Sequence, residues 1–134
     1  MAVQLSPTAK QFLKGKVWAH VATLMKDGSP QVTPVWVDTD ENDNILINTA
    51  YPRVKPRNLE RDPRIGMSIM GLDDPQRYLS VRGVVKEMST ERGNADIDRL
   101  SLKYTGNPQY QGHREGETRV TIIIEPTAVV ERRL

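Results

Sequence analysis

Polar and hydrophobic residues alternate along several short segments of the chain, and this alternation is the pattern of β-strands with one buried face. The segments are rich in β-branched residues, and turn signals such as Asp27-Gly28 separate them. Gly83 lies inside the fifth segment, where we expect a bulge or a bend, and Pro126 separates the last two. The predicted strands are residues 17–25, 31–38, 45–49, 64–70, 77–89, 119–125 and 128–134.

Three other segments have the apolar spacing and the end signals of helices. Ser6 is suited to cap the first helix, Pro7 to open it and Gly15 to end it. Residues 107–117 follow the third helix as a loop of about eleven residues, a length at which a functional or covering role is common. The predicted helices are residues 7–14, 56–62 and 90–106.

Together these elements predict an α+β fold that is mainly antiparallel β. Six to seven strands joined by hairpin-type turns favour a barrel, with two or three helices at its sides. The chain has 134 residues, without an internal repeat or a linker. We therefore expect residues 1–134 to form a single domain.

The amino-acid composition excludes several classes of function. The chain has no cysteine, which excludes disulfides, thiolate chemistry and cysteine-bound metals. Its two histidines are far apart in the sequence, and we predict no metal site. No apolar run approaches the roughly 20 residues of a membrane span, and no apolar leader is present, so we expect a cytoplasmic protein.

Charge is nearly balanced overall, with a net charge of +2, so it matters only where it clusters. Aromatic residues make up 5% of the chain, too few for a surface that stacks single-stranded bases. Acidic residues also interrupt the basic segments, which argues against a nucleic-acid partner. These acids are Glu60, Asp62, Asp73 and Asp74.

One short connection, TAYPRVKPRNLERDPR (residues 49–64), gathers many of the cations. Pro56 disfavours helical geometry at Lys55, so we expect residues 53–55 to be extended, with Arg53 and Lys55 on one side. Pro56 would then open a helix whose free N–H groups lie beside both cations, an arrangement that suits a phosphate. The alternative is a solvated charge run, neutralised by neighbouring carboxylates.

A phosphate socket alone would bind weakly. Three charge-assisted hydrogen bonds give about 4–9 kcal/mol before the costs of association, whereas micromolar binding needs about 8 net. The ligand therefore needs a flat or apolar remainder. Pro34 interrupts a good strand, which must be exposed or bulged there and leaves the Val35 N–H or the Thr33 carbonyl free for a ligand. The alternative is an edge-strand proline that blocks aggregation.

Three segments, DGSPQVTPVWVD, ILINTAYPRVKPRNLERDPRIGMSI and RYLSVRG, resemble in order and spacing the flavin and deazaflavin oxidoreductases related to pyridoxamine 5′-phosphate oxidase. The resemblance spans Val17 to Tyr104 and is to the branch that uses the deazaflavin coenzyme F420. It implies a split β-barrel that works as a homodimer, with a cofactor groove at the subunit interface.

The resemblance also implies roles for single residues. It assigns the cofactor phosphate to Arg53 and Lys55, with Arg57 assisting. It places Asn48 and Thr49 beside the ribityl-phosphate chain of the cofactor.

On the same grounds, the backbone of Thr33, Pro34 and Val35 would face the tricyclic ring of the cofactor. Tyr78 would approach the cofactor from the partner subunit. Relatives often carry an aromatic residue two positions before this tyrosine, where Gln76 stands here.

The function that the resemblance implies is hydride transfer from reduced F420 to an electrophilic small molecule, such as an enone, a quinone or an activated double bond. No catalytic residue is assigned, because the cofactor carries the chemistry. Trp36 either packs in the barrel or lines a substrate pocket, and His113, with Tyr110 and Arg114, either closes over a substrate or lies on the surface.

Two alternatives remain open. An FMN-dependent oxidase of a pyridoxal-type phosphate would need a second anion site, for which the sequence offers no equally convincing cluster. A non-catalytic protein that binds F420 or a flavin would share every binding residue. The anionic oligoglutamate tail of F420 favours that cofactor only slightly, because Arg61 and Arg64 could either meet the tail or pair with nearby acids.

Overall fold

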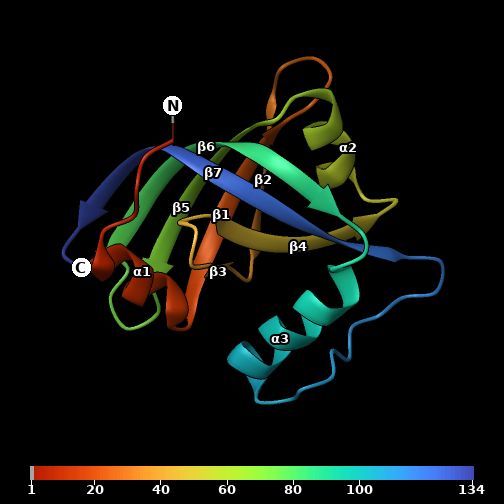
Figure 1. Ribbon diagram of the computed structural model, residues 1–134. Helices are drawn as coiled ribbons and strands as arrows, with labels where there is room; N and C mark the ends of the chain where they lie inside the picture. The colour runs from red at the N-terminus through yellow and green to blue at the C-terminus, as the bar shows by residue number, and fades with distance from the viewer. Residues whose placement is uncertain (1) are drawn as a thin grey trace.

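The computed structural model describes residues 2–134, which form seven strands and three helices (Figure 1). The helices are α1 (Pro7–Lys14), α2 (Val54–Arg61) and α3 (Gly93–Thr105). The strands are β1 (Val17–Leu24), β2 (Pro30–Val35), β3 (Asp38–Thr39), β4 (Ile45–Tyr51), β5 (Arg64–Gly71), β6 (Tyr78–Ser89) and β7 (Thr118–Arg132).

All strands belong to one curled sheet in the order β2-β1-β5-β6-β7-β4-β3, and every neighbouring pair is antiparallel. The expected α+β, mainly antiparallel fold is therefore confirmed. The interior of the curled sheet is filled by β-branched and leucine side chains, because residues two apart on each strand face the same side. The fully buried members include Leu13, Ile45, Ile47, Ile69, Leu79, Ile122 and Ile124.

The bulge expected at Gly83 is present. It also explains why the chain does not divide into two strands at Pro126, as the sequence had predicted. The pairing of β6 with β7 shifts between Arg82, opposite Ala128, and Gly83, opposite Pro126. Pro126, which cannot donate to a ladder, lies at this irregularity, so the strand continues past it. The two predicted final strands are therefore one strand, β7. A side chain at Gly83 would come within 2.6 Å of the Glu125 carbonyl oxygen, which is why glycine stands there.

The strand predicted for residues 31–38 is divided in the structure. β2 ends at Val35, and Asp38–Thr39 form β3 at the opposite edge of the sheet. β2 is itself an edge strand, as the proline at position 34 requires, so the missing N–H interrupts no inner ladder.

The start of α2 is also corrected. The helix begins at Val54, not at Pro56, so Lys55 is helical and not extended. Proline is tolerated in the first turn of a helix, where its missing N–H has no intrahelical partner. Burial of Leu59 and a 3.0 Å hydrogen bond from Asn58 Nδ2 to Thr23 Oγ1 hold the helix against β1. The argument that alternation places Arg53 and Lys55 on one side was therefore wrong.

Two of the helices, α2 and α3, flank strand β4. In Figure 1, α2 and α3 lie on opposite sides of β4, and α3 packs on β7 and β4. Among residues 2–134, every helix is too short or too polar to span a bilayer.

Candidate functional site

A cavity of about 260 Å³ opens where β2, β4, α3 and the start of β7 meet. Four of the residues predicted from the sequence line it, although they come from three separate segments: Pro34, Val35, Asn48 and Arg53. The other lining residues are Trp18, Trp36, Ile97, Leu100, Tyr110 and Arg119. One wall is thus aromatic and apolar, and another carries two guanidinium groups.

Positive charge gathers at the end of the cavity next to α2. Arg53 is the N-cap residue of this helix, its side chain is 43% exposed, and it makes no capping hydrogen bond. By position, the N–H groups of Val54 and Lys55 have no intrahelical acceptor. An anion near this corner would meet both the free N–H groups and the positive end of the helix dipole.

Lys55 is only 9% exposed. Burial, followed by the charges of Arg53 and Arg119, lowers the pKa of Lys55 from 10.5 to about 8. Within residues 2–134 its ammonium group makes no ion pair and no hydrogen bond. Lys55 is therefore a buried cation without a counter-ion, next to two other cations.

Arg119, which was not predicted, is the third cation. It is 5% exposed, and its Nε donates to Asn48 Oδ1 at 2.9 Å. The amide of Asn48 is in turn fixed by a 2.9 Å bond from Nδ2 to the Gly93 carbonyl at the start of α3. The side chain of Asn48 is thus already engaged in joining β4, β7 and α3. We refer to Arg53, Lys55 and Arg119 as the cation cluster.

Among residues 2–134, Glu117 supplies the one carboxylate that forms ion pairs with this cluster. Its Oε2 lies 3.5 Å from a guanidinium nitrogen of Arg53 and 3.5 Å from one of Arg119, and its Oε1 lies 3.1 Å from His113 Nδ1. Burial alone would raise the pKa of Glu117. The bonds from His113 and from the Arg114 backbone and the two guanidinium charges outweigh burial and hold that pKa below its ordinary value. Glu117 is therefore ionised at neutral pH.

Aromatic side chains pack together beside the cation cluster. Trp36 lies parallel to Tyr104, with ring centroids 5.2 Å apart, and Tyr110 meets Trp36 edge-on at 6.0 Å. Trp18 lies 6.0 Å from Tyr104, whose hydroxyl donates to the Val17 carbonyl at 2.5 Å. Such a wall offers a flat ligand a firm apolar surface.

The remaining predicted residues do not line the cavity. Thr33 is half-buried in β2, and Thr49 is buried on β4 with its side chain on the face opposite to that of Asn48. Arg57 is exposed on α2. Tyr78 on β6 pairs with Arg132 near the end of β7, whereas Arg119 of the cation cluster lies near the start of β7.

Trp18, Tyr110, Arg119 and Glu117 were not predicted as site residues. One signal was available: Arg119 opens a strand that is otherwise apolar, and a charge in such a position is uncommon without a partner. Nothing local in the sequence shows that Asn48 is that partner. Within the described residues, no group of three or more His, Asp or Glu side chains could hold a metal ion.

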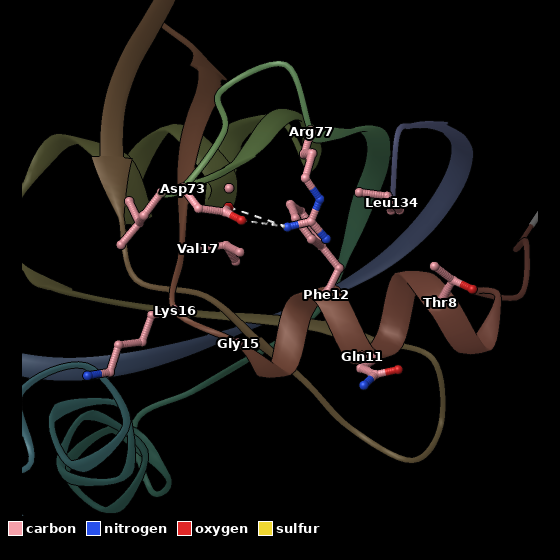
Figure 2. A pocket seen from close by; sticks show the side chains of 11 residues that line it. Thr8, Gln11, Phe12, Gly15, Lys16, Val17, Asp73, Arg77 and Leu134 are labelled. Atoms are coloured by element: carbon pink, nitrogen blue, oxygen red, sulfur yellow. Dashed lines mark hydrogen bonds and ion pairs between the residues drawn. The ribbon is translucent and has the colours of Figure 1, made fainter.

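A larger cavity, of about 560 Å³, lies between α1 and the loop that joins β5 to β6 (Figure 2). Its only arginine, Arg77, points toward Asp73 at 3.3 Å and lies over the ring of Phe12, 5.3 Å from its centroid. Lys16 at its edge is exposed. This cavity has no buried cation, so we regard the smaller one as the candidate site.

Both the sequence and the fold of this chain are similar to those of known proteins. The sequence model of the pyridoxamine 5′-phosphate oxidase family matches residues 5–132. An F420 reductase of known structure is 29% identical, with a TM-score of 0.81 over 94% of this chain and 98% of its own.

Two more distant structures share the fold alone. A conserved hypothetical protein of Mycobacterium tuberculosis is 22% identical, with a TM-score of 0.70 over 96% of this chain and 84% of its own. General stress protein 26 of Bacillus anthracis is 16% identical, with a TM-score of 0.64 over 91% of this chain and 88% of its own.

Proposed function

Because the chain belongs to the pyridoxamine 5′-phosphate oxidase family, we propose that it is an F420-dependent oxidoreductase. It acts as a reductase toward an electrophilic small molecule, such as an enone, a quinone or an activated double bond. The observation that carries this proposal is the cavity itself, which sets a cluster of cations beside an aromatic wall. A ligand that joins a phosphate to a flat ring matches both halves.

The residues present fit such a cofactor. Arg53, Lys55 and the start of α2 would hold its phosphate, and the buried, unpaired ammonium of Lys55 supports this role. Arg57, exposed on the same helix, would assist with the phosphate. The structure favours the local alternative for the two arginines beyond it, because Arg64 pairs with Asp62 at 2.7 Å and Arg61 donates to Asn58 Oδ1 at 2.7 Å. When bound, the cofactor supplies the hydride chemistry.

The rest of the site orients the ring and excludes water. The exposed edge of β2 at Thr33, Pro34 and Val35 is available to face a ring, since Pro34 leaves the ladder there without a donor. The stacked Trp36 gives the acceptor a flat surface. Asn48 acts from β4 by fixing the position of Arg119, whereas the buried side chain of Thr49 faces the other side of the strand.

F420 is favoured over FMN by the similarity to the F420 reductase. An FMN-dependent oxidase of a phosphorylated pyridoxal-type substrate would need a second anion site. In the larger cavity, Arg77 is already paired with Asp73. A non-catalytic protein that binds F420 remains the other alternative.

We further propose that two copies of the chain complete each site. The cavity of about 260 Å³ is smaller than the roughly 300–1,000 Å³ of typical ligand pockets. Tyr78 on β6 does not line the cavity of its own chain. In a homodimer with the groove at the subunit interface, Tyr78 would reach the cofactor of the other copy.

The test of this proposal is turnover. Reduced F420 is mixed with the protein and with menadione or cyclohexenone, and reoxidation is followed by absorbance. Reoxidation that depends on protein and on acceptor supports a reductase. Binding of F420 without reoxidation by any acceptor would support the non-catalytic alternative, and a protein that binds FMN but not F420 would support the oxidase.

A further inference from the structure

The guanidinium group of Arg119 contains a buried donor beside the candidate site. Its Nη1 is fully buried and has no hydrogen-bond partner within the part of the chain that the structure describes. Arg119 nevertheless lines the cavity. Buried charged donors are rarely left unpaired, because the loss of their water is costly. A donor that stays unpaired at a cavity wall is suited to a ligand.

The geometry holds this donor in a fixed position. Arg119 Nε is bonded to Asn48, and Cζ lies over the ring of Tyr110, 5.1 Å from its centroid. Glu117 Oε2 lies 3.5 Å from Nη1 and forms an ion pair with it. The guanidinium plane is therefore set by Asn48 and Tyr110, and Glu117 is the charge that a ligand would have to displace from Nη1.

The charges around the donor do not balance. The cation cluster carries three positive charges and Glu117 carries one negative charge, which leaves two positive charges uncompensated. Glu117 divides its Oε2 between Arg53 and Arg119 at equal distances of 3.5 Å. A dianionic group, or two anionic groups of one ligand, would restore neutrality.

We propose that Arg119 is a binding residue for the anionic part of the ligand, and that Glu117 is an internal counter-ion which competes with this ligand for Arg53 and Arg119. The guanidinium group of Arg119 donates to a ligand oxygen, and the ion pair of Glu117 with Arg53 loosens when the ligand binds. The inference deepens the proposed function and rests on it only for the ring of the ligand.

Two substitutions should change the Kd of the ligand in opposite directions. Arg119→Lys keeps the charge but loses the planar group that serves Asn48 and the ligand together, so we expect the Kd to rise at least tenfold. Glu117→Gln keeps the shape and removes the competing charge, so we expect the Kd to fall severalfold. A purely structural role for either residue would lower stability without this opposition. Arg82→Lys, an exposed substitution on β6, is the matched control.

Each variant is titrated with F420 and, in parallel, with pyrophosphate, at one ionic strength and after a melting curve confirms folding. Pyrophosphate is a probe that carries the anion and no ring. If Arg119→Lys does not fold, Glu117→Gln alone decides the matter by the sign of its effect. An unchanged Kd for folded Arg119→Lys, or a raised Kd for Glu117→Gln, would overturn the proposal.

The titrations with F420 and with pyrophosphate distinguish a failure of this proposal from a failure of the proposed function. If F420 does not bind but pyrophosphate responds to both substitutions as expected, the assignment of F420 fails and the role of Arg119 stands. If F420 binds the wild type and both variants equally, the role of Arg119 fails and the cofactor assignment stands. If neither ligand binds the wild-type protein, both are wrong.

Discussion

We expect Lys55 to lower the stability of the ligand-free protein and to favour the binding of an anion. A buried ammonium group without a counter-ion destabilises the ligand-free protein, because its hydration is lost and no partner replaces it. The neighbouring charges of Arg53 and Arg119 add to this cost. An arriving anion would convert the same charge into a favourable interaction.

Lys55→Met should therefore separate the two effects. The substitution keeps an unbranched side chain and removes the charge, so we expect the melting temperature of the ligand-free protein to rise by a few degrees. We expect the affinity for F420 to fall at least tenfold, the equivalent of about one charge-assisted hydrogen bond. Calorimetry and fluorescence titration measure the two quantities, with exposed Lys86→Met as control. A lower melting temperature with unchanged affinity would assign Lys55 to packing alone.

The lowered pKa of Lys55 also predicts how binding depends on pH. The ammonium group loses its proton as the pH rises through about 8, so the affinity for an anion should fall there. The charges of Arg53 and Arg119, which act on Lys55, are present in both the wild type and Lys55→Met, so a comparison of the two proteins isolates the ammonium group. Titrations between pH 6.5 and 9.5 should show the fall in the wild type and not in Lys55→Met. The same fall in both proteins would exclude Lys55 as its origin.

Stability should depend on pH with the opposite sign. Because the pKa of Lys55 is lower in the folded protein than the ordinary 10.5, the unfolded chain binds more protons between about pH 8 and 10.5. The free energy of unfolding of the ligand-free protein should therefore rise over that range. Lys103, whose pKa burial also lowers to about 8, contributes in the same direction, so the Lys55→Met variant should retain part of the rise.

At the scale of elements, the site depends on the close contact between α3 and β7. Gly93, in the first turn of α3, lies directly against the backbone of Arg119. A Cβ atom at Gly93 would overlap the Arg119 carbonyl group, so no side chain is tolerated without movement of the helix. The Gly93 carbonyl also accepts the bond from Asn48 that helps to fix Arg119.

Gly93→Ala should thus affect both the fold and the site. We expect the free energy of unfolding to fall by about 1–3 kcal/mol, as in other overpacked positions. Ligand affinity should fall with it, because the backbone that carries Arg119 must shift. Gly66→Ala on β5 is the matched control, since a Cβ there would meet no atom within 4 Å. Equal stability of the two variants in a denaturant titration would contradict this description of the contact.

The sequence predicted those elements that depend on local signals. Alternation located the strands, and Gly83 marked its bulge, because both follow from neighbours along the chain. The start of α2 was misplaced because burial of Leu59 and the Asn58 bond to β1 outweighed the local preference of the residue before proline. β7 was divided for a related reason, since the bulge that accommodates Pro126 depends on β6.

Four of the ten residues that line the candidate site were among those predicted from the sequence. The sequence pointed to Arg53 and Lys55 because they lie close together in a segment rich in charge. Arg119 was missed because its partner, Asn48, is 71 residues away, and no local pattern reports such a contact. Glu117 was missed because its role depends on two arginines from separate elements.

At the scale of the whole molecule, the proposal that two copies complete each site predicts the mass of the protein in solution. We expect sedimentation to give a mass of about twice the 15.2 kDa of one chain. Tyr78→Ala should then weaken F420 binding although this residue does not line the cavity of its own chain. A monomer that binds F420 fully, or a dimer whose affinity ignores Tyr78, would show that one chain is sufficient.

The docking of a phosphate-bearing ring at the cation cluster is tested most directly by titrating the protein with F420 and with FMN side by side, at one ionic strength, for the wild type and for Lys55→Met. We expect F420 to bind the wild type with a Kd in the micromolar range or below, FMN to bind at least tenfold more weakly, and F420 affinity to fall at least tenfold in the variant. Tighter binding of FMN than of F420, or an F420 affinity that Lys55→Met leaves unchanged, would contradict it.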